Sequence, residues 1–143
     1  MEESLKICPP FKLAVGDTNC YRCGATFPAV AVLGMLSDGE NTESAILSYM
    51  KDPPESILTH IRQHALAFRK VYSQTAECEY YANVCPRCDA FAGDHFLHAP
   101  SSVFFPTDER DVEQLRIVDV PIAEPMTIVA DAGFNTWVSR VFD

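Results

Sequence analysis

Two short Cys-x-x-Cys pairs constrain this chain more than any other feature, and they use four of its six cysteines. The first pair is Cys20 and Cys23, and the second is Cys85 and Cys88. A gap of two residues lets both sulfurs of a pair turn inward at a tight loop, where backbone N–H groups stabilise their charge. Four thiolates are the ligand set of a closed, tetrahedral zinc site. The sequence therefore predicts one structural Zn²⁺ per chain, held by these four cysteines.

The residues around each pair suit two similar loops, or knuckles, that face one ion. Gly24 follows the first pair at a position that often needs a left-handed backbone, and Asp89 stands at the same place after the second pair. Glycine adopts that conformation freely, and aspartate is one of the few other residues that tolerates it. Pro86 fixes φ inside the second loop. Both loops are therefore expected to turn in the same way.

A long intervening segment, residues 24–84, separates the two pairs. Closing a flexible loop of this length costs about 3–4 kcal/mol plus a constant. Structural zinc in small modules contributes an apparent ~10–16 kcal/mol, so the ion offsets that cost. At 143 residues the chain is long enough to bury a core of its own. We expect residues 1–143 to form a single zinc-binding domain.

Two other uses of the pairs compete with zinc. A redox Cys-x-x-Cys of the thioredoxin type sits at the start of a helix, and neither residues 25–28 nor residues 90–93 have the sequence of a strong helix start. Four cysteines also suit an iron–sulfur or single-iron centre. Zinc is the preferred metal, and iron stays open.

The acidic composition bears on partners. The formal net charge is −9, and four thiolates with one divalent ion would lower it to about −11. Nucleic-acid binding needs clustered Lys and Arg, and the 11 such residues here are spread along the chain. A nucleic-acid partner is therefore not expected, and a basic protein partner fits the charge better.

Cysteine use and apolar runs bear on the compartment. The chain shows no positively charged leader followed by an apolar run, and its longest apolar stretch, residues 27–36, is too short for a membrane span. With four cysteines in metal-type pairs, reduced thiols fit better than a disulfide framework. A cytoplasmic location without membrane contact is predicted. Cys8 and Cys78 are left over and are expected to be small buried apolar residues.

The first half of the chain predicts a hairpin followed by a helix. Residues 1–10 read as a terminal arm, and apolar strands at 11–15 and 29–33 flank the first knuckle. The type of the apolar segment 45–50 is left open. A helix is expected to begin at Asp52 with a capping box to Glu55, and its apolar face ends near residues 65–68.

The second half predicts strands. They are expected at 79–84, leading into the second knuckle, and at 115–120, 126–130 and 136–141, with a loop across 99–111. The predicted fold class is therefore α+β. A zinc-ribbon-like knuckle pair would join an antiparallel sheet, with one main helix inserted between the two pairs.

One family resemblance rests on spaced motifs. These are Cys-x-x-Cys-Gly at 20–24, Tyr-x-Asn-x-Cys-Pro-x-Cys at 81–88 and Gly-Asp-x-x-Leu at 93–97. The pattern resembles small bacterial zinc-ribbon-like proteins of unassigned function, over roughly residues 18–105. This resemblance implies a metal site and a bacterial, cytoplasmic setting, and it supplies no catalytic residues.

The histidines offer weaker candidates for chemistry. His60 and His64 stand four apart on the predicted helix, but the Glu that follows the first His in catalytic zinc helices is absent, so they are not expected to be ligands. Asp94, His95 and His98 follow the second knuckle and could serve as a base or as ligands. Two functions therefore stay open. One is a non-catalytic interaction or regulatory module, including one that binds or neutralises a basic protein, and the other is a metal- or thiol-dependent enzyme that uses Asp94, His95 or His98.

Overall fold

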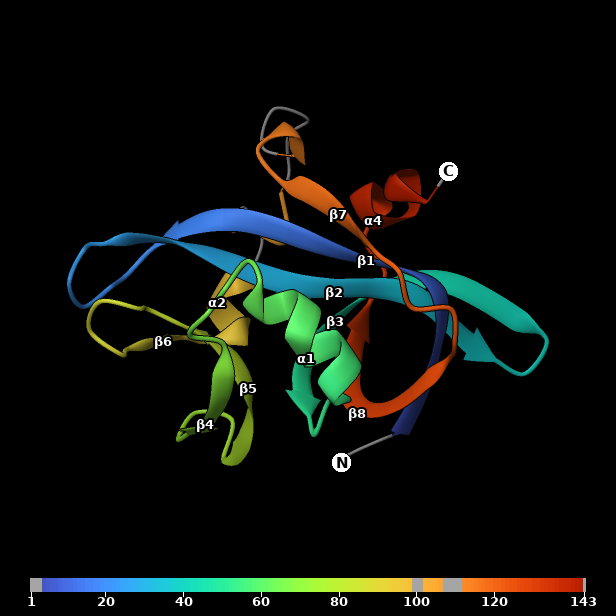
Figure 1. The fold of residues 1–143 in the computed structure, drawn as a ribbon, viewed down its shortest axis with the longest axis horizontal. Coiled ribbons are helices and arrows are strands. Elements are labelled where there is room, and N and C mark those ends of the chain that lie inside the picture. The colour runs from blue at the N-terminus through green and yellow to red at the C-terminus, as the bar shows by residue number, and fades with distance from the viewer. Residues whose placement is uncertain (1–3, 99–101, 107–111, 143) are drawn as a thin grey trace.

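A computed structural model describes residues 4–98, 102–106 and 112–142, and this described part is mostly β, with 52% strand and 14% helix. The elements in chain order are β1 (Ser4–Asn19), β2 (Thr26–Asp38), β3 (Asn41–Lys51), α1 (Glu55–Arg62), β4 (Arg69–Ser73), β5 (Cys78–Val84), β6 (Phe91–Ala92), α2 (Asp94–Leu97), β7 (Arg116–Val120), β8 (Met126–Gly133) and α4 (Thr136–Val141) (Figure 1).

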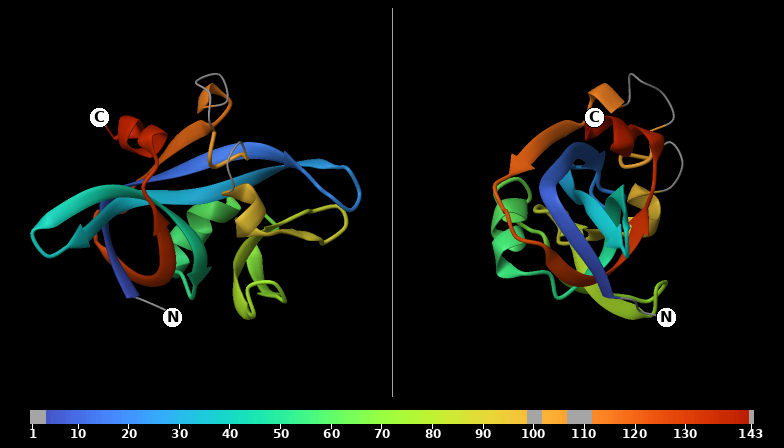
Figure 2. Two further views of the ribbon diagram at one scale, coloured as in Figure 1. Left: turned by 180° about the vertical axis from the view of Figure 1, so that it is seen from behind. Right: turned by 90° about the vertical axis from the view of Figure 1, so that its right-hand side faces the viewer.

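Four of the strands close into a barrel. Antiparallel pairing runs from β1 to β2, β3 and β8 in turn, and β8 returns to the first part of β1, where Ile7 pairs with Met126. β7 pairs with the later part of β1 as an outer strand. The right-hand view of Figure 2 looks nearly along this barrel. The predicted α+β fold, a zinc-ribbon-like knuckle pair with one main helix, is therefore wrong.

The barrel strands carry apolar residues on both faces, and this explains why the predicted fold differs from the observed barrel. In β1, Leu13 and Val15 belong to one core cluster, while Ala14 between them belongs to a second. The first cluster includes Ile57, Leu58 and Ile61 of α1, and the second includes Trp137 and Val138 of α4. Strands covered on both faces read as continuous apolar runs. Such runs show that a strand is buried without showing that the sheet closes.

Residues 55–97, which follow β3 in the chain, form an insertion between barrel strands. It contains α1, the small sheet β4-β5-β6 and α2, which lie below β1 and β2 in Figure 1, whereas α4 lies above them. The turn between β5 and β6 extends in the same direction as the tip of the β1–β2 hairpin, both in Figure 1 and in the left-hand view of Figure 2. This arrangement brings the two cysteine pairs together.

The helix of the insertion begins later than predicted. α1 starts at Glu55, its N-cap is Pro54, and no side chain caps it, so the expected capping box from Asp52 is wrong. A proline disfavours helical backbone in the residue before it, so the second of two prolines excludes Pro53 from the helix. Asp52 instead has a left-handed φ of 48°. The predicted apolar face is confirmed at Ile57, Leu58 and Ile61, which are buried.

Two other segments differ from the prediction. The predicted arm at residues 1–10 is wrong for residues 4–10, because β1 begins at Ser4 and Ile7 is fully buried; residues 1–3 lie outside the described part. Pro9 and Pro10 fit within the strand at a register shift, where ladder hydrogen bonds are interrupted. Residues 136–141 form the helix α4 instead of a strand, because burial of Trp137 and Val138 outweighs their strand propensity. The strands predicted around 79–84, 115–120 and 126–130 are confirmed as β5, β7 and β8, and segment 45–50 lies in β3.

Among the described residues, no helix is both long and apolar enough to cross a membrane.

Candidate metal centre

The first cysteine loop, residues 20–25, connects β1 to β2. The last strand pair before it joins Asn19 to Thr26. Within the loop the backbone N–H of Cys20 donates to the Ala25 carbonyl at 2.8 Å, and the N–H of Gly24 donates to the Cys20 carbonyl at 2.9 Å. Gly24 has a left-handed φ of 77°. The predicted turn is therefore confirmed at this loop.

The second cysteine loop, residues 85–90, connects β5 to β6 and repeats this geometry. The N–H of Cys85 donates to the Ala90 carbonyl at 2.8 Å, and the N–H of Asp89 donates to the Cys85 carbonyl at 2.9 Å. Asp89 has a φ of 66° and so occupies the place of Gly24. Two loops of the same shape thus come from different sheets.

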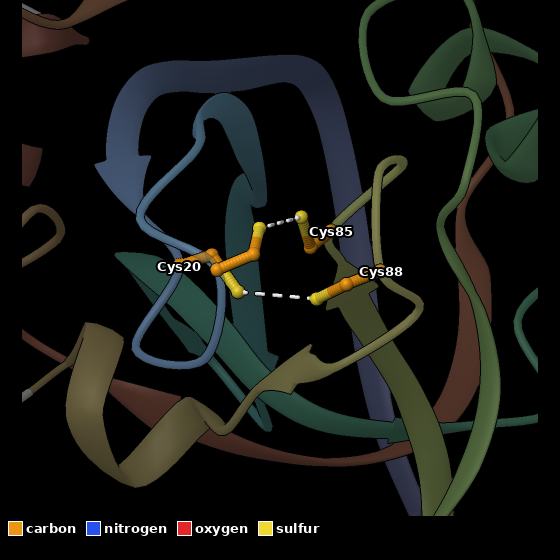
Figure 3. A group of neighbouring side chains, drawn as sticks. Cys20, Cys85 and Cys88 are labelled. Atoms are coloured by element: carbon orange, nitrogen blue, oxygen red, sulfur yellow. Dashed lines mark hydrogen bonds between the residues drawn. The ribbon is translucent and has the colours of Figure 1, made fainter.

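The four thiols of the two loops meet in one cluster (Figure 3), and their sulfurs all lie within 4.8 Å of one another. The Sγ atoms of Cys20 and Cys88 are 3.5 Å apart, and those of Cys23 and Cys85 are 3.7 Å apart. A zinc ion bound at 2.3 Å by each sulfur of a regular tetrahedron would separate the sulfurs by about 3.8 Å. The two shorter separations are close to this value, and the cluster could therefore hold a metal ion.

The burial of the cluster is uneven. Cys20 and Cys85 are buried, Cys88 is partly buried and Cys23 is exposed. Phe27 and small residues such as Ala90 pack against the buried pair. The inner thiols are thus held by the core, and the exposed thiol of Cys23 gives a metal ion or a chelator access from solvent.

Backbone donors favour a thiolate at one of the inner positions. The N–H of Cys23 lowers the pKa of the Cys20 thiol to about 6, against the effect of burial, and the N–H of Arg22 assists. That second N–H lies 3.4 Å from Cys20 Sγ. The Cys20 thiol is therefore largely a thiolate at neutral pH, which is the form that binds a cation.

The opposite thiol behaves differently. The N–H of Ala90 lowers the pKa of Cys88, but burial and the shared hydrogen bonds with the other three thiols outweigh it and raise that pKa to about 12. Sulfurs this close cannot all carry negative charge without a cation among them. Full deprotonation of the cluster therefore requires a bound metal ion.

The other sequence candidates lie outside this cluster. His60 is in α1 and His64 follows it. Cys8 lies in β1 and Cys78 begins β5, and both are half-buried. His60 and His64 are not part of the cluster of four thiols, and neither are Cys8 and Cys78.

The three residues proposed for catalysis occupy α2 and its end. The side chain of His95 lies outside the described part of the structure. The His98 ring packs 5.1 Å from the Phe104 ring, and burial lowers the pKa of His98 to about 4, which keeps it neutral. Asp94 is buried, and its carboxylate accepts the backbone N–H of Tyr49 at 2.7 Å.

Tyr49 and Tyr80 complete a polar network that the sequence did not indicate. Tyr49 has a left-handed φ of 53° at a register shift in β3, and the hydroxyl of Tyr80 accepts the backbone N–H of Asp94 at 3.1 Å. The two tyrosine rings lie 4.9 Å apart. A bulge has no sequence signature without glycine, so this network was not predictable.

Comparison with family models, with characterised proteins and with solved structures finds no match to this chain. The four-cysteine cluster is compatible with a zinc-ribbon-like site. The resemblance to bacterial zinc-ribbon-like proteins stays a prediction.

Proposed function

We propose that this protein is a non-catalytic interaction module whose fold is held by one structural zinc ion, bound by Cys20, Cys23, Cys85 and Cys88. The observation that carries this proposal is the set of four sulfurs within 4.8 Å of one another. Four thiolates fill a tetrahedral shell and leave no position for water or substrate. A closed site of this kind stabilises a fold and does not perform hydrolysis.

The metal would connect two parts of the structure. Cys20 and Cys23 belong to the hairpin of the barrel, and Cys85 and Cys88 belong to the insertion. A shared ion would therefore make residues 1–143 one folding unit, consistent with reduced thiols in a cytoplasmic location.

The acidic charge supports a basic protein as the partner. A net charge of −9 attracts cationic surfaces and repels nucleic acid. Electrostatic attraction of this type accelerates association and weakens as salt shortens the Debye length.

The alternative function, an enzyme using Asp94, His95 or His98, has less support. The Asp94 carboxylate is buried and already accepts a backbone N–H, and the His98 ring is packed against Phe104. The two described side chains are therefore held by the core.

Metal analysis and affinity capture test the proposal. Purified protein is expected to contain one zinc per chain and to be colourless, whereas a red or brown protein would indicate iron. The metal-loaded chain, immobilised as bait, should capture basic proteins from its host, and their association rate should fall as salt rises. Absence of stoichiometric metal would refute the structural site, and salt-independent association would refute electrostatic recognition.

A further inference from the structure

A large cavity lies beside the first cysteine loop. Its volume is about 1360 Å³, and it is lined by the end of β1, the turn between β4 and β5, and the segment from β6 to α2. Pockets of 300–1,000 Å³ already hold drug-sized ligands. The volume is therefore sufficient for more than one amino-acid side chain.

Tyrosines dominate the aromatic lining. The chain has five tyrosines, and Tyr21, Tyr49, Tyr72 and Tyr80 line this cavity together with Phe91. Tyr80 is 1% exposed, Tyr72 is 58% exposed and Tyr21 is 81% exposed. The rings thus extend from the buried floor of the cavity to its rim.

Among the described residues, the only charged side chain in the lining is negative. None of the described residues that line the cavity is a lysine, an arginine or a histidine, and Asp17 is its only acidic residue. The carboxyl group of Asp94 lies behind the floor, where it accepts the backbone N–H of Tyr49, and its raised pKa leaves Asp17 as the main negative charge. Burial raises the pKa of Tyr49 and that of Tyr80, so both phenols stay protonated at neutral pH.

We propose that this cavity binds a cationic organic group, an ammonium or guanidinium on an alkyl stem, carried by a basic segment of the protein partner. The faces of aromatic rings attract such cations, and Asp17 adds an opposite charge at the rim. An alkyl stem also gains from contact with the apolar parts of the rings. The inference rests on the proposed function and names the chemistry that its partner presents.

Calorimetric titration of the metal-loaded full chain at low salt tests the inference with three probes. The first is a decapeptide of alternating lysine and glycine, the second is the same peptide with every lysine acetylated, and the third is choline, a free quaternary ammonium. The charged peptide is expected to bind at least about 10-fold more tightly than its acetylated form, because acetylation removes the charge and keeps the stem.

Exposed tyrosines provide variants that keep the fold. Tyr72→Ala should weaken binding of the lysine peptide about 2- to 5-fold, and the double variant with Tyr21→Ala on the order of 10-fold. Tyr72→Phe keeps the ring and should stay within about 2-fold. Phe134→Ala is the matched control, since Phe134 is 49% exposed and lies outside the cavity lining. Zinc content and circular dichroism of each variant establish that it is folded.

Each contrary result has a distinct meaning. Equal binding of the acetylated peptide, or unchanged binding in the double tyrosine variant, would overturn the cavity as a cation site. If the double tyrosine variant binds the peptide unchanged and this binding is salt-sensitive, the cavity inference fails while the proposed acidic interaction module stays intact. Choline binding that depends on Tyr72, without peptide binding, would overturn a protein segment as the source of the cation.

Discussion

The side-chain amide of Asn83 forms two hydrogen bonds with the backbone of Val30. The Val30 N–H donates to Asn83 Oδ1 at 2.8 Å, and Asn83 Nδ2 donates to the Val30 carbonyl at 3.1 Å. β3 pairs with β2 only from Leu33 onward, so Val30 lies where β2 lacks this neighbour. The amide replaces a strand at this edge. It fixes β5 against the barrel just before Cys85 and so aligns the two cysteine loops.

Asn83→Leu should lower the free energy of unfolding by about 2–4 kcal/mol, because two backbone groups of Val30 lose their buried partners. Urea denaturation of the metal-loaded protein measures the change. Asn41→Ala, at an exposed position next to the β2–β3 turn, is the control and should cost less than about 0.5 kcal/mol. Equal effects of the two substitutions would show that the amide bridge contributes nothing.

Cys85→Ser should release the metal and lower the free energy of unfolding by about 3 kcal/mol or more. Cys85 is fully buried within the cluster, whereas Cys78 lies outside it, so Cys78→Ser should keep the metal. Elemental analysis and thermal unfolding, each with and without a chelator, measure both effects. Chelation should destabilise the native protein and Cys78→Ser alike, and should change Cys85→Ser little. A chelator effect of the same size in all three proteins would contradict the four-thiolate site.

Substitutions at Gly24 test the shape shared by the loops. Gly24→Asp should keep the metal with a small loss of stability, because Asp89 adopts the same left-handed backbone in the second loop. Gly24→Val should cost about 1–2 kcal/mol more, since a branched side chain is strained at positive φ. The space around Gly24 is open, so the difference would come from the backbone and not from a clash. Denaturation curves that coincide for the two variants would argue against this explanation.

Asp94 should make the protein less stable as pH rises. Burial raises the pKa of its carboxyl from 3.8 to about 7, the Tyr49 N–H opposes the rise and Asp131 adds to it. Between these values the folded state keeps a proton that the unfolded chain has released, so the free energy of unfolding falls as pH increases from about 4 to 7.

Asp94→Asn removes this titration while keeping an acceptor for Tyr49. The variant should gain stability relative to the native protein between pH 4.5 and 8, by up to about 4 kcal/mol. Metal binding also depends on pH, but it affects both proteins equally, so the difference between their urea midpoints isolates Asp94. Parallel pH profiles would show that the carboxyl titrates normally.

The four-cysteine cluster was predictable because its signal is local. Each Cys-x-x-Cys pair, with Gly24 or Asp89 after it, specifies a loop from a few neighbouring residues. The strand nature of 79–84 follows equally from local alternation and aromatic content. The left-handed backbone was expected at Gly24 and Asp89 from the local sequence, and the structure confirms it at both residues.

The barrel was not predictable in the same way, because closure depends on pairing between distant segments. Nothing near Ile7 indicates that it pairs with Met126, and the run around Ala29 reads the same in an open or a closed sheet. The helix at 136–141 likewise depends on the core that Trp137 enters. Such tertiary contacts override local propensity.

β8 comes late in the chain, so it is synthesised after both cysteine loops. Both cysteine loops precede Met126, so the ribosome delivers all four thiols before the strand that closes the barrel. Until then the edges of β1 and β3 that receive β8 are unpaired, and unpaired edges invite association with other chains. A metal ion captured at that stage would already fasten the insertion to the nascent sheet. Availability of metal during translation would then affect the yield of correctly closed protein, as well as the stability of the finished one.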